Sequence, residues 1–293
     1  MIRYTQCPVC KSTDFSEVMQ AKDYTVSGEM FGIAHCKSCT HRFTNPVPGQ
    51  AEIGPYYKSA EYVSHTNTSK GLINSMYQRV RKITLRSKRK LLERSTGLTQ
   101  GKHLDVGSGA GAFLATMKSA GWDCLGLEPD PDARAVAKAD FGVEAKPIEE
   151  LFNLPAAGFD AITMWHVLEH VHELDAYMVK LKALLKDNGR LFIAVPNYTS
   201  LDGQKYQSKW AAYDVPRHLY HFSPTSMKRL LELNGLKLIV MKRMPYDSFY
   251  VSMLTERNTG GGMVKAIWVG WRSWWTALWR LERCSSLIYV IQK

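Results

Sequence analysis

The sequence predicts an α/β protein built on a doubly wound, mostly parallel sheet, with a small cysteine-containing module ahead of it. Three observations predict this class. Strand-like and helix-like segments alternate from residue 102 onward, a glycine-rich loop at 107–111 follows the first of these strands, and two C-x-x-C pairs come before residue 40. Alternating strands and helices favour parallel strands joined by right-handed crossover helices. The 293 residues are enough for one large domain and a small one.

Two short-spaced cysteine pairs characterise the N-terminal module. Each C-x-x-C turn aims two thiolates at one point, which suits tetrahedral Zn²⁺. A redox pair or a disulfide is the alternative, but a second matching pair in a reducing cytoplasm disfavours it. We therefore predict a zinc-ribbon-like module whose structural zinc is held by Cys7, Cys10, Cys36 and Cys39. A closed four-thiolate site leaves no position for a substrate. The adjacent His35 and His41 are expected to be neighbours of the ion and not ligands.

Hydrophobic periodicity and turn residues place the other elements in order. The predicted division is 1–60 for the module and a Pro/Gly connector, 61–100 for a basic helical segment, and 101–293 for the α/β domain. The expected strands are 102–106, 123–128, 143–147, 159–165, 190–197, 236–243 and 285–293. The expected helices are 70–94, 110–120, one starting near 130, 172–188 and one ending near 235. The last begins at Ser223-Pro224, an N-cap followed by a first-turn proline.

The formal charge of +11 is concentrated in two places. Segment 70–94 carries nine basic residues against Glu93 alone, and the tail from 241 carries eight basic residues against three acids. Residues 95–240 are slightly acidic, with fifteen basic residues against seventeen acids. A protein that binds nucleic acid along its whole surface would carry positive charge throughout the chain. Nucleic acid is therefore disfavoured as a partner without being excluded. The first ten residues lack the apolar stretch of a secretion signal, so we expect a cytoplasmic protein.

The loop "DVGSGAG", residues 105–111, indicates an adenosine-containing cofactor. It fits the dinucleotide pattern G-x-G-x-x-G/A and also a D-x-G-x-G-x-G pattern. Glu128 ends the second strand 21 residues after Gly107, where a carboxylate can accept both ribose hydroxyls in either cofactor class. The loop lets backbone N–H groups approach an anionic group at a helix N-terminus. Spacing alone leaves both cofactor classes open.

Four motifs together resemble one family. The loop 105–111, Glu128 after "CLGL", "FDAITMWHVLEHV" and "LKALLKDNGRLFIAVPN" resemble class I S-adenosylmethionine-dependent methyltransferases, in that family's order over 103–240. The chain looks most like the ubiquinone-biosynthesis group and its bacterial relatives. This resemblance implies a Rossmann-like methyltransferase fold over 101–293, S-adenosylmethionine as cofactor, and a small-molecule or lipid-linked acceptor. The zinc-type module followed by "YYKSAEYVSH" resembles relatives linked to surface-glycan and sugar modification, which implies a sugar or surface-glycan precursor.

The resemblance also implies a cofactor site. In that family the acid and the glycines of the loop hold the methionine end, the acid after the second strand holds the ribose, and the end of the fourth strand faces the sulfonium. The implied residues are Asp105, Gly107, Ser108, Gly109, Gly111, Glu128, Pro129, Ile148, Glu149, Trp165 and His166. Family members often place an acid before "EEL" to bind the adenine amine, but Pro147 stands there. Glu149 or the backbone around Ile148 would have to substitute.

Methyl transfer is an in-line displacement, so the positioning of a nucleophile supplies much of the rate. A hydroxyl or acidic-carbon nucleophile also needs a base near neutral pH, and the candidates are His166, His218 and His221. The connection 197–222 is longer than a structureless loop usually is. It is expected to line an acceptor pocket or, alternatively, to pack on its sheet. Its candidate pocket residues are Trp210, Tyr213, Asp214, Arg217 and Tyr220.

The sequence leaves three other interpretations open. "HVLEH" at 166–170 matches the H-x-x-E-H pattern of zinc peptidases, but no third ligand is evident, and Glu169 with His170 is expected to form a buried polar pair. An RNA methyltransferase that docks through the zinc module and helix 70–94 is disfavoured by the near-neutral module. A non-enzymatic zinc adaptor is disfavoured by the intact glycine loop.

Residues 263–281, "MVKAIWVGWRSWWTALWRL", form a tryptophan-rich amphipathic insertion. The segment is long enough to span a bilayer, but Lys265, Arg272 and Arg280 interrupt it, and a central arginine costs about 2.5–3.5 kcal/mol on insertion. We expect a helix with tryptophans on one face and cations opposite, which suits peripheral contact with the inner face of a membrane. The alternative, which is favoured, is that the tryptophans pack on the domain or cover the acceptor pocket.

Overall fold

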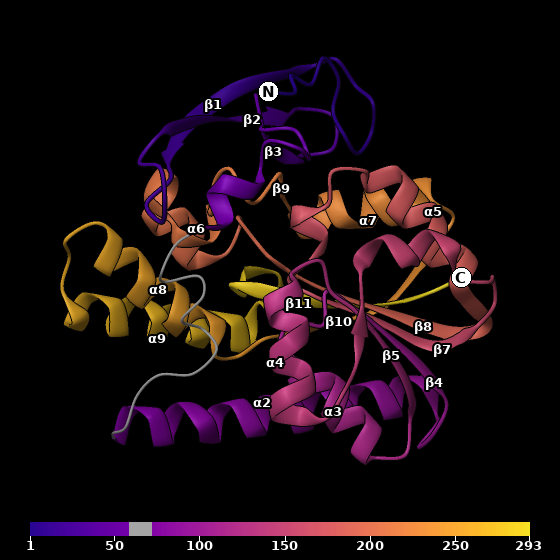
Figure 1. Ribbon diagram of the computed structural model, residues 1–293. Coiled ribbons are helices and arrows are strands. Elements are labelled where there is room, and N and C mark those ends of the chain that lie inside the picture. The colour runs from indigo at the N-terminus through magenta and orange to yellow at the C-terminus, as the bar shows by residue number, and fades with distance from the viewer. Residues whose placement is uncertain (59–71) are drawn as a thin grey trace. The chain divides into compact units, whose positions relative to one another are not determined.

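The computed structural model describes residues 1–58 and 72–293 (Figure 1). These residues form two compact units. The first unit contains 1–58, Leu168–Leu174 and Ala194–Tyr289, and the second contains 72–167, Asp175–Ile193 and Val290–Lys293. These units cut across the predicted division at residue 101. The predicted segment 61–100 is described from residue 72, and its earlier part, with most of "YYKSAEYVSH", lies outside the described residues.

The second unit contains the glycine loop and most of the alternating elements. Its helices are α2 (Leu72–Thr96), α3 (Ala112–Ser119), α4 (Pro131–Phe141) and α5 (Leu174–Leu184). Its strands are β4 (Lys102–Val106), β5 (Asp123–Leu127), β6 (Ala145–Lys146), β7 (Phe159–Trp165) and most of β8 (Leu185–Pro196). Helices α2, α3 and α4 lie on one side of these strands and α5 on the other (Figure 1).

A seven-stranded sheet has the order β10-β11-β8-β7-β4-β5-β6. The pairs β4–β5, β4–β7 and β5–β6 are parallel. Strand β4 therefore lies between its successor β5 and the later strand β7. This reversal of strand order is where doubly wound sheets bind ligands, beyond the carboxyl ends of the strands. The predicted Rossmann-like fold class is confirmed.

Most predicted elements are present, but the helix predicted over 172–188 is wrong at its end. Helix α5 stops at Leu184, and β8 begins at Leu185. The backbone N–H groups of Ala157 and Gly158 donate to the carbonyls of Ala183 and Leu184, at 2.8 and 3.0 Å. These two carbonyls therefore accept from a neighbouring turn, and the helix ends about one turn before the predicted residue 188.

The first unit contains a four-stranded antiparallel sheet of order β1-β2-β3-β9. Its strands are β1 (Phe15–Lys22), β2 (Met30–Cys36), β3 (Arg42–Thr44) and β9 (Tyr220–His221). The other elements of this unit are α6 (Leu201–Tyr206), α7 (Pro224–Leu233), β10 (Lys237–Arg243), α8 (Asp247–Asn258), α9 (Met263–Trp279) and most of β11 (Ser286–Gln292). The N-terminal sheet is thus completed by a strand from the connection 197–222.

That connection is part of the core of the first unit. Trp210 and Tyr213 are buried in one apolar cluster with Phe31 and Ile33 of β2. The indole N–H of Trp210 donates to the buried carboxylate of Asp202 at 2.8 Å. The prediction that the connection lines an acceptor pocket is therefore wrong for its buried members, which are Trp210, Tyr213, Arg217 and Tyr220. The alternative, a connection packed on its sheet, agrees with the structure.

A buried ion network fixes the connection to the end of β1. The Arg217 guanidinium, 1% exposed, donates to Asp23 at 2.8 Å and to Asp214 at 2.6 Å. It also donates to the backbone carbonyl of Tyr56 at 2.9 Å. Removing one member of such a buried pair usually costs about 3–5 kcal/mol, because it leaves a charge without its counterion. This network specifies how the connection packs. Within the described ranges, no helix is both long enough and apolar enough to cross a bilayer.

Candidate functional site

The glycine loop joins β4 to α3 and is fixed to the end of β5. The backbone N–H groups of Gly107 and Ser108 both donate to the carbonyl oxygen of Leu127, at 2.8 and 2.9 Å. Gly107, Gly109 and Gly111 have φ values of 71°, 52° and 79°, which residues with a Cβ rarely adopt. The predicted loop residues thus form one tight turn at the carboxyl end of β4.

The three glycines are needed for different reasons. A Cβ at Gly107 would collide with the side chain of Val167, which follows β7. A Cβ at Gly111 would lie 2.8 Å from Cβ of Ala137 on α4, so this glycine permits close helix packing. At Gly109 no protein atom lies within 4 Å of the Cβ position. The backbone of Gly109 is therefore the part of the loop that a ligand can approach closely.

Glu128 holds the loop from the end of β5. One carboxylate oxygen accepts the Gly109 N–H at 2.8 Å, and the other accepts the Asp130 N–H at 3.0 Å. The side chain is buried, and burial raises the pKa of this carboxyl above its usual value. Each oxygen keeps a second lone pair, so the group can accept further hydrogen bonds from ligand hydroxyls.

Asp105, at the end of β4, is the second buried acid of this edge. Burial raises the pKa of its carboxyl to about 7, although the Thr163 hydroxyl donates to it at 2.6 Å. The Thr163 oxygen lies 2.9 Å from Nε2 of His103, whose pKa burial lowers to about 3. His103 is therefore neutral near pH 7, and Asp105 loses its proton only near neutral pH, well above the usual range of a carboxyl.

The end of β7 brings an aromatic ring and a histidine to the same edge of the sheet. The Trp165 ring contacts Phe113 edge-on, with centroids 5.4 Å apart. Lys88 of α2 places its ammonium 4.2 Å from the Trp165 ring centroid, and its charge lowers the pKa of Asp105. His166 has a φ of 59°, an uncommon conformation for a residue with a side chain and one enriched at functional sites. The sequence analysis missed Lys88, because a single lysine in a basic helix carries no signal of its own.

The other predicted cofactor residues follow β5 and β6. The Glu128 N–H donates to the carbonyl of Lys146 at 2.8 Å, which sets the 3-10 turn Ile148–Asn153 beside the end of β5. Pro129 and Glu149 are exposed, and Ile148 is half-buried. Their contacts with a cofactor stay predictions, and Pro147 begins the turn as its N-cap.

The other two predicted histidines belong to the first unit. His221 is buried in β9, with Nε2 3.2 Å from the Thr44 hydroxyl, and burial holds its pKa well below the usual value. His218 has Nδ1 2.9 Å from the carbonyl of Ala212. The ring of His218 lies edge-on to that of His170, with centroids 4.5 Å apart.

Glu169, His170 and His218 bring one ligand atom each within 4.8 Å of one another. Nδ1 of His170 is 3.0 Å from the carbonyl of Arg217, and burial lowers the pKa of this histidine to about 4. The expected pair of Glu169 and His170 therefore has His218 as a third member. This potential metal-binding set differs from that of the H-x-x-E-H pattern, since His166 is not part of it among the described residues.

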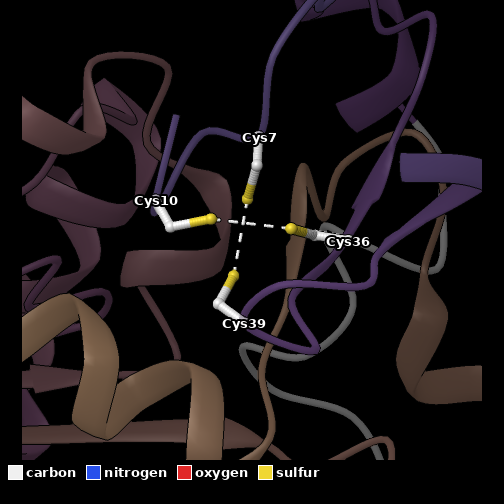
Figure 2. Close-up of side chains that lie close together, drawn as sticks. All are labelled: Cys7, Cys10, Cys36 and Cys39. Carbon is white, nitrogen blue, oxygen red and sulfur yellow. Dashed lines mark hydrogen bonds between the residues drawn. The ribbon is translucent and has the colours of Figure 1, made fainter. Parts of the chain in front are cut away.

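The four predicted zinc ligands come together in the first unit (Figure 2). Their sulfurs all lie within 4.8 Å of one another, with Cys7 and Cys39 at 3.6 Å and Cys10 and Cys36 at 3.5 Å. A tetrahedral zinc with Zn–S bonds of about 2.3 Å requires sulfurs about 3.8 Å apart. The Cys39 thiol donates to the Cys7 sulfur and lowers the pKa of Cys7 to about 5. The donor set therefore fits a tetrahedral thiophilic metal.

The two cysteine turns have the same backbone geometry. The N–H of Lys11 donates to the carbonyl of Cys7, and that of Thr40 to the carbonyl of Cys36, both at 2.9 Å. Lys11 and Thr40 have φ values of 61° and 60°. Residues at equivalent positions thus adopt the same left-handed conformation, and each turn points its two thiols at the other. His35 and His41 are not in the ligand set, as expected.

Comparison with known proteins identifies the family of the central region. A family model described as "Methyltransferase domain" matches residues 77–240. The mitochondrial ubiquinone biosynthesis O-methyltransferase of Rattus norvegicus is 29% identical over 182 residues, covering 54% of this chain and 52% of that protein. The ubiquinone biosynthesis O-methyltransferase of Xanthomonas axonopodis is 27% identical over 161 residues, covering 49% of this chain and 66% of that protein. The chain thus spans about half the length of the mammalian relatives it matches.

Solved structures support the same fold. The 1,6-didemethyltoxoflavin-N1-methyltransferase of Burkholderia thailandensis superimposes with a TM-score of 0.52 at 16% identity. The match covers 88% of this chain and 98% of that one, which contains bound S-adenosylhomocysteine. At this identity the similarity establishes the fold alone.

The raised pKa of Asp105 predicts a specific pH dependence of stability. Because the folded state binds this proton more tightly than the unfolded state, its stabilising effect is complete below about pH 4. It is lost as the pH rises to about 7. Relative to Asp105→Asn, the wild-type free energy of unfolding should fall by roughly 3–4 kcal/mol across this window. Urea unfolding of both proteins at pH 4–8 measures this difference in the free energy of unfolding. Asp187→Asn, at a carboxylate with 96% exposure, should keep the wild-type profile. Parallel profiles for the wild type and Asp105→Asn would contradict the assignment.

Proposed function

Because the chain belongs to the methyltransferase domain family, we propose that it transfers the methyl group of S-adenosylmethionine to a small-molecule or lipid-linked acceptor. The observation that carries this proposal is the pair of buried acids, Asp105 and Glu128, at the ends of adjacent strands beside the open backbone of Gly109. Two carboxylates favour a cationic ligand and repel the pyrophosphate of a dinucleotide. This charge preference supports S-adenosylmethionine over a dinucleotide, the choice that spacing left open.

Each part of the edge then has a role toward the cofactor. Asp105 and the loop backbone hold the methionine end, and the free lone pairs of Glu128 accept the ribose hydroxyls. Lys88, above the Trp165 ring, supplies a positive charge for the cofactor carboxylate. When bound, the cofactor supplies a sulfonium whose methyl carbon is open to in-line attack. These residues therefore bind and orient the cofactor.

We assign the general base to His166. It lies at the end of β7, on the same edge as the loop, and is half-buried. A base must reach the proton that it removes, and neutral imidazole is suited to that near pH 7. His166 would take the proton of an acceptor hydroxyl as the oxygen attacks the methyl carbon, the carbon–sulfur bond breaks, and S-adenosylhomocysteine leaves. His221, buried and bonded to Thr44, is suited to packing. His218 stays an alternative.

The acceptor class rests on two considerations. Relatives named ubiquinone biosynthesis O-methyltransferases modify oxygen, so a hydroxyl is the acceptor group we propose. The cysteine module carries nearly balanced charge, which gives no support to RNA docking. A sugar or surface-glycan precursor is an acceptor of this class, and we propose that the protein acts on the cytoplasmic side of the cell.

We also propose that the four cysteines hold one structural Zn²⁺. Four thiolates close the coordination shell, so the ion stabilises the turns and leaves no position for a substrate. Its contribution is to the folding of the sheet β1-β2-β3-β9.

Calorimetry tests the cofactor assignment. Glu128→Ala removes the carboxylate that accepts ribose hydroxyls and fixes the loop, so affinity for S-adenosylmethionine should fall at least tenfold, about 1.4 kcal/mol. Glu144→Ala, at an exposed acid paired with Lys138, is the matched control and should bind as wild type does. Unchanged affinity in Glu128→Ala, or tighter binding of NAD than of S-adenosylmethionine, would contradict the proposal.

Metal analysis tests the zinc assignment. The purified protein should contain about one zinc per chain, and Cys7→Ser/Cys36→Ser should contain none, because each turn loses a ligand. The control Cys124→Ser/Cys284→Ser changes the two remaining cysteines and should keep the metal. Retention of zinc by the first double variant would show that these cysteines are not the ligands.

A further inference from the structure

Helix α9 turns its large apolar side chains outward, whereas an ordinary surface helix turns them inward. The residues that it buries have small side chains, none larger than valine: Ala266, Val269, Gly270, Ser273 and Ala277. It packs beside α8, and the Gly270 carbonyl accepts a hydrogen bond from Ser248 of α8 at 3.1 Å (Figure 1). A helix in a globular protein normally turns its large apolar side chains inward. Here small residues take the inward face.

The large apolar side chains of α9 face outward. Trp268, Trp271 and Trp275 are each 48–49% exposed, and Trp279 is 79% exposed. We define the tryptophan face as Val264, Ile267, Trp268, Trp271, Trp275 and Trp279, all exposed. The prediction that the tryptophans pack on the domain is therefore wrong for these four. An apolar surface of this kind on one helix marks an interaction site.

The tryptophan face is ordered by its own contacts. Trp271 and Trp275 stack with ring centroids 5.7 Å apart and planes 27° apart. The Arg272 guanidinium lies 4.7 Å from the ring centroid of Trp268. Tyr246, the N-cap of α8, and Tyr250 in its first turn are also exposed. The rings therefore form a preorganised apolar surface, which loses little side-chain entropy on binding.

The charges of this helix are all positive. Its 17 residues contain Lys265 and Arg272 and no acid, and Arg280 follows as the C-cap. Lys265 forms an ion pair with the buried Glu256 at 2.9 Å, whereas Arg272 is exposed over its tryptophan. Lys265 and Arg272 lie about a quarter turn from the centre of the tryptophan face, since helical positions advance about 100° per residue. The prediction that the cations lie opposite is wrong for these two, because the buried residues occupy the opposite face.

We infer that the tryptophan face docks onto the surface of an anionic lipid bilayer, with the axis of α9 in the plane of the interface. Tryptophan and tyrosine concentrate at the depth of lipid headgroups, where an apolar ring and a polar N–H or O–H are both accommodated. A flanking cation is at the right height to meet phosphate. A symmetric contact between two copies would bring like charges together, so the bilayer is the better complement. The inference goes beyond methyl transfer and does not depend on it.

Vesicle flotation of the full-length protein tests the inference. The wild type should float with vesicles of phosphatidylcholine and phosphatidylserine at low salt, and tenfold less with phosphatidylcholine alone. Trp268→Ala/Trp271→Ala/Trp275→Ala should lose at least tenfold in bound fraction. Arg272→Glu should weaken binding to anionic vesicles and leave binding to neutral vesicles unchanged. The control Val179→Ala/Leu233→Ala changes exposed apolar side chains of other helices and should float as the wild type does. Circular dichroism checks that each variant is folded.

Three results would overturn the inference. The first is a wild type that stays at the bottom of the gradient at low salt. The second is a folded triple variant that floats as well as the wild type, which would place lipid contact elsewhere. The third is self-association that the triple variant abolishes, together with equal flotation on neutral and anionic vesicles. That result would show that the tryptophan face binds a second copy of the chain and not a bilayer. Cofactor binding by the triple variant, measured separately, keeps a failure here distinct from a failure of the proposed function.

Discussion

The attachment of the glycine loop to the end of β5 is the constraint on which the candidate site depends. One carbonyl, that of Leu127, accepts two loop N–H groups, and Glu128 bonds Gly109 and Asp130 at once. The same carboxylate therefore fixes the loop and the entry to α4. Glu128 is thus held beside the backbone of Gly109, which a ligand can approach, and each carboxylate oxygen keeps a lone pair for that ligand. Binding and local folding thus share one side chain, and its removal should affect both.

The geometry of the glycine loop could be predicted from the sequence because its signals are local. Three glycines within five residues define the turn, and the acids end strands whose apolar pattern is unambiguous. Features that depend on distant segments were missed. Lys88 reaches Trp165 from a helix far away in sequence, and β9 pairs with β3, whose Phe43 lies opposite Tyr220. The early start of β8 coincides with hydrogen bonds from a turn at Ala157 and Gly158, which lies outside the segment 172–188 and leaves no signal in it.

The connection 197–222 shows how a correct observation led to a wrong conclusion. Its length and aromatic content are unusual for a loop, and both suggested an acceptor pocket. In the structure the aromatic rings fill the core of the first unit, and Arg217 is neutralised by Asp23 and Asp214. The excess length supplies a strand and a core to the N-terminal sheet. In α9 the periodicity was predicted correctly, but which face turns inward was not, since tertiary packing of small residues decides it.

The most direct test of the account is methyl transfer itself. The purified protein would be incubated with methyl-labelled S-adenosylmethionine and fractionated extract of the cells that express it, and each labelled product identified by mass spectrometry. The account predicts label on the oxygen of a small or lipid-linked compound, with release of S-adenosylhomocysteine. Cofactor binding without label in any fraction would contradict the enzymatic role, and label confined to RNA would contradict the acceptor class.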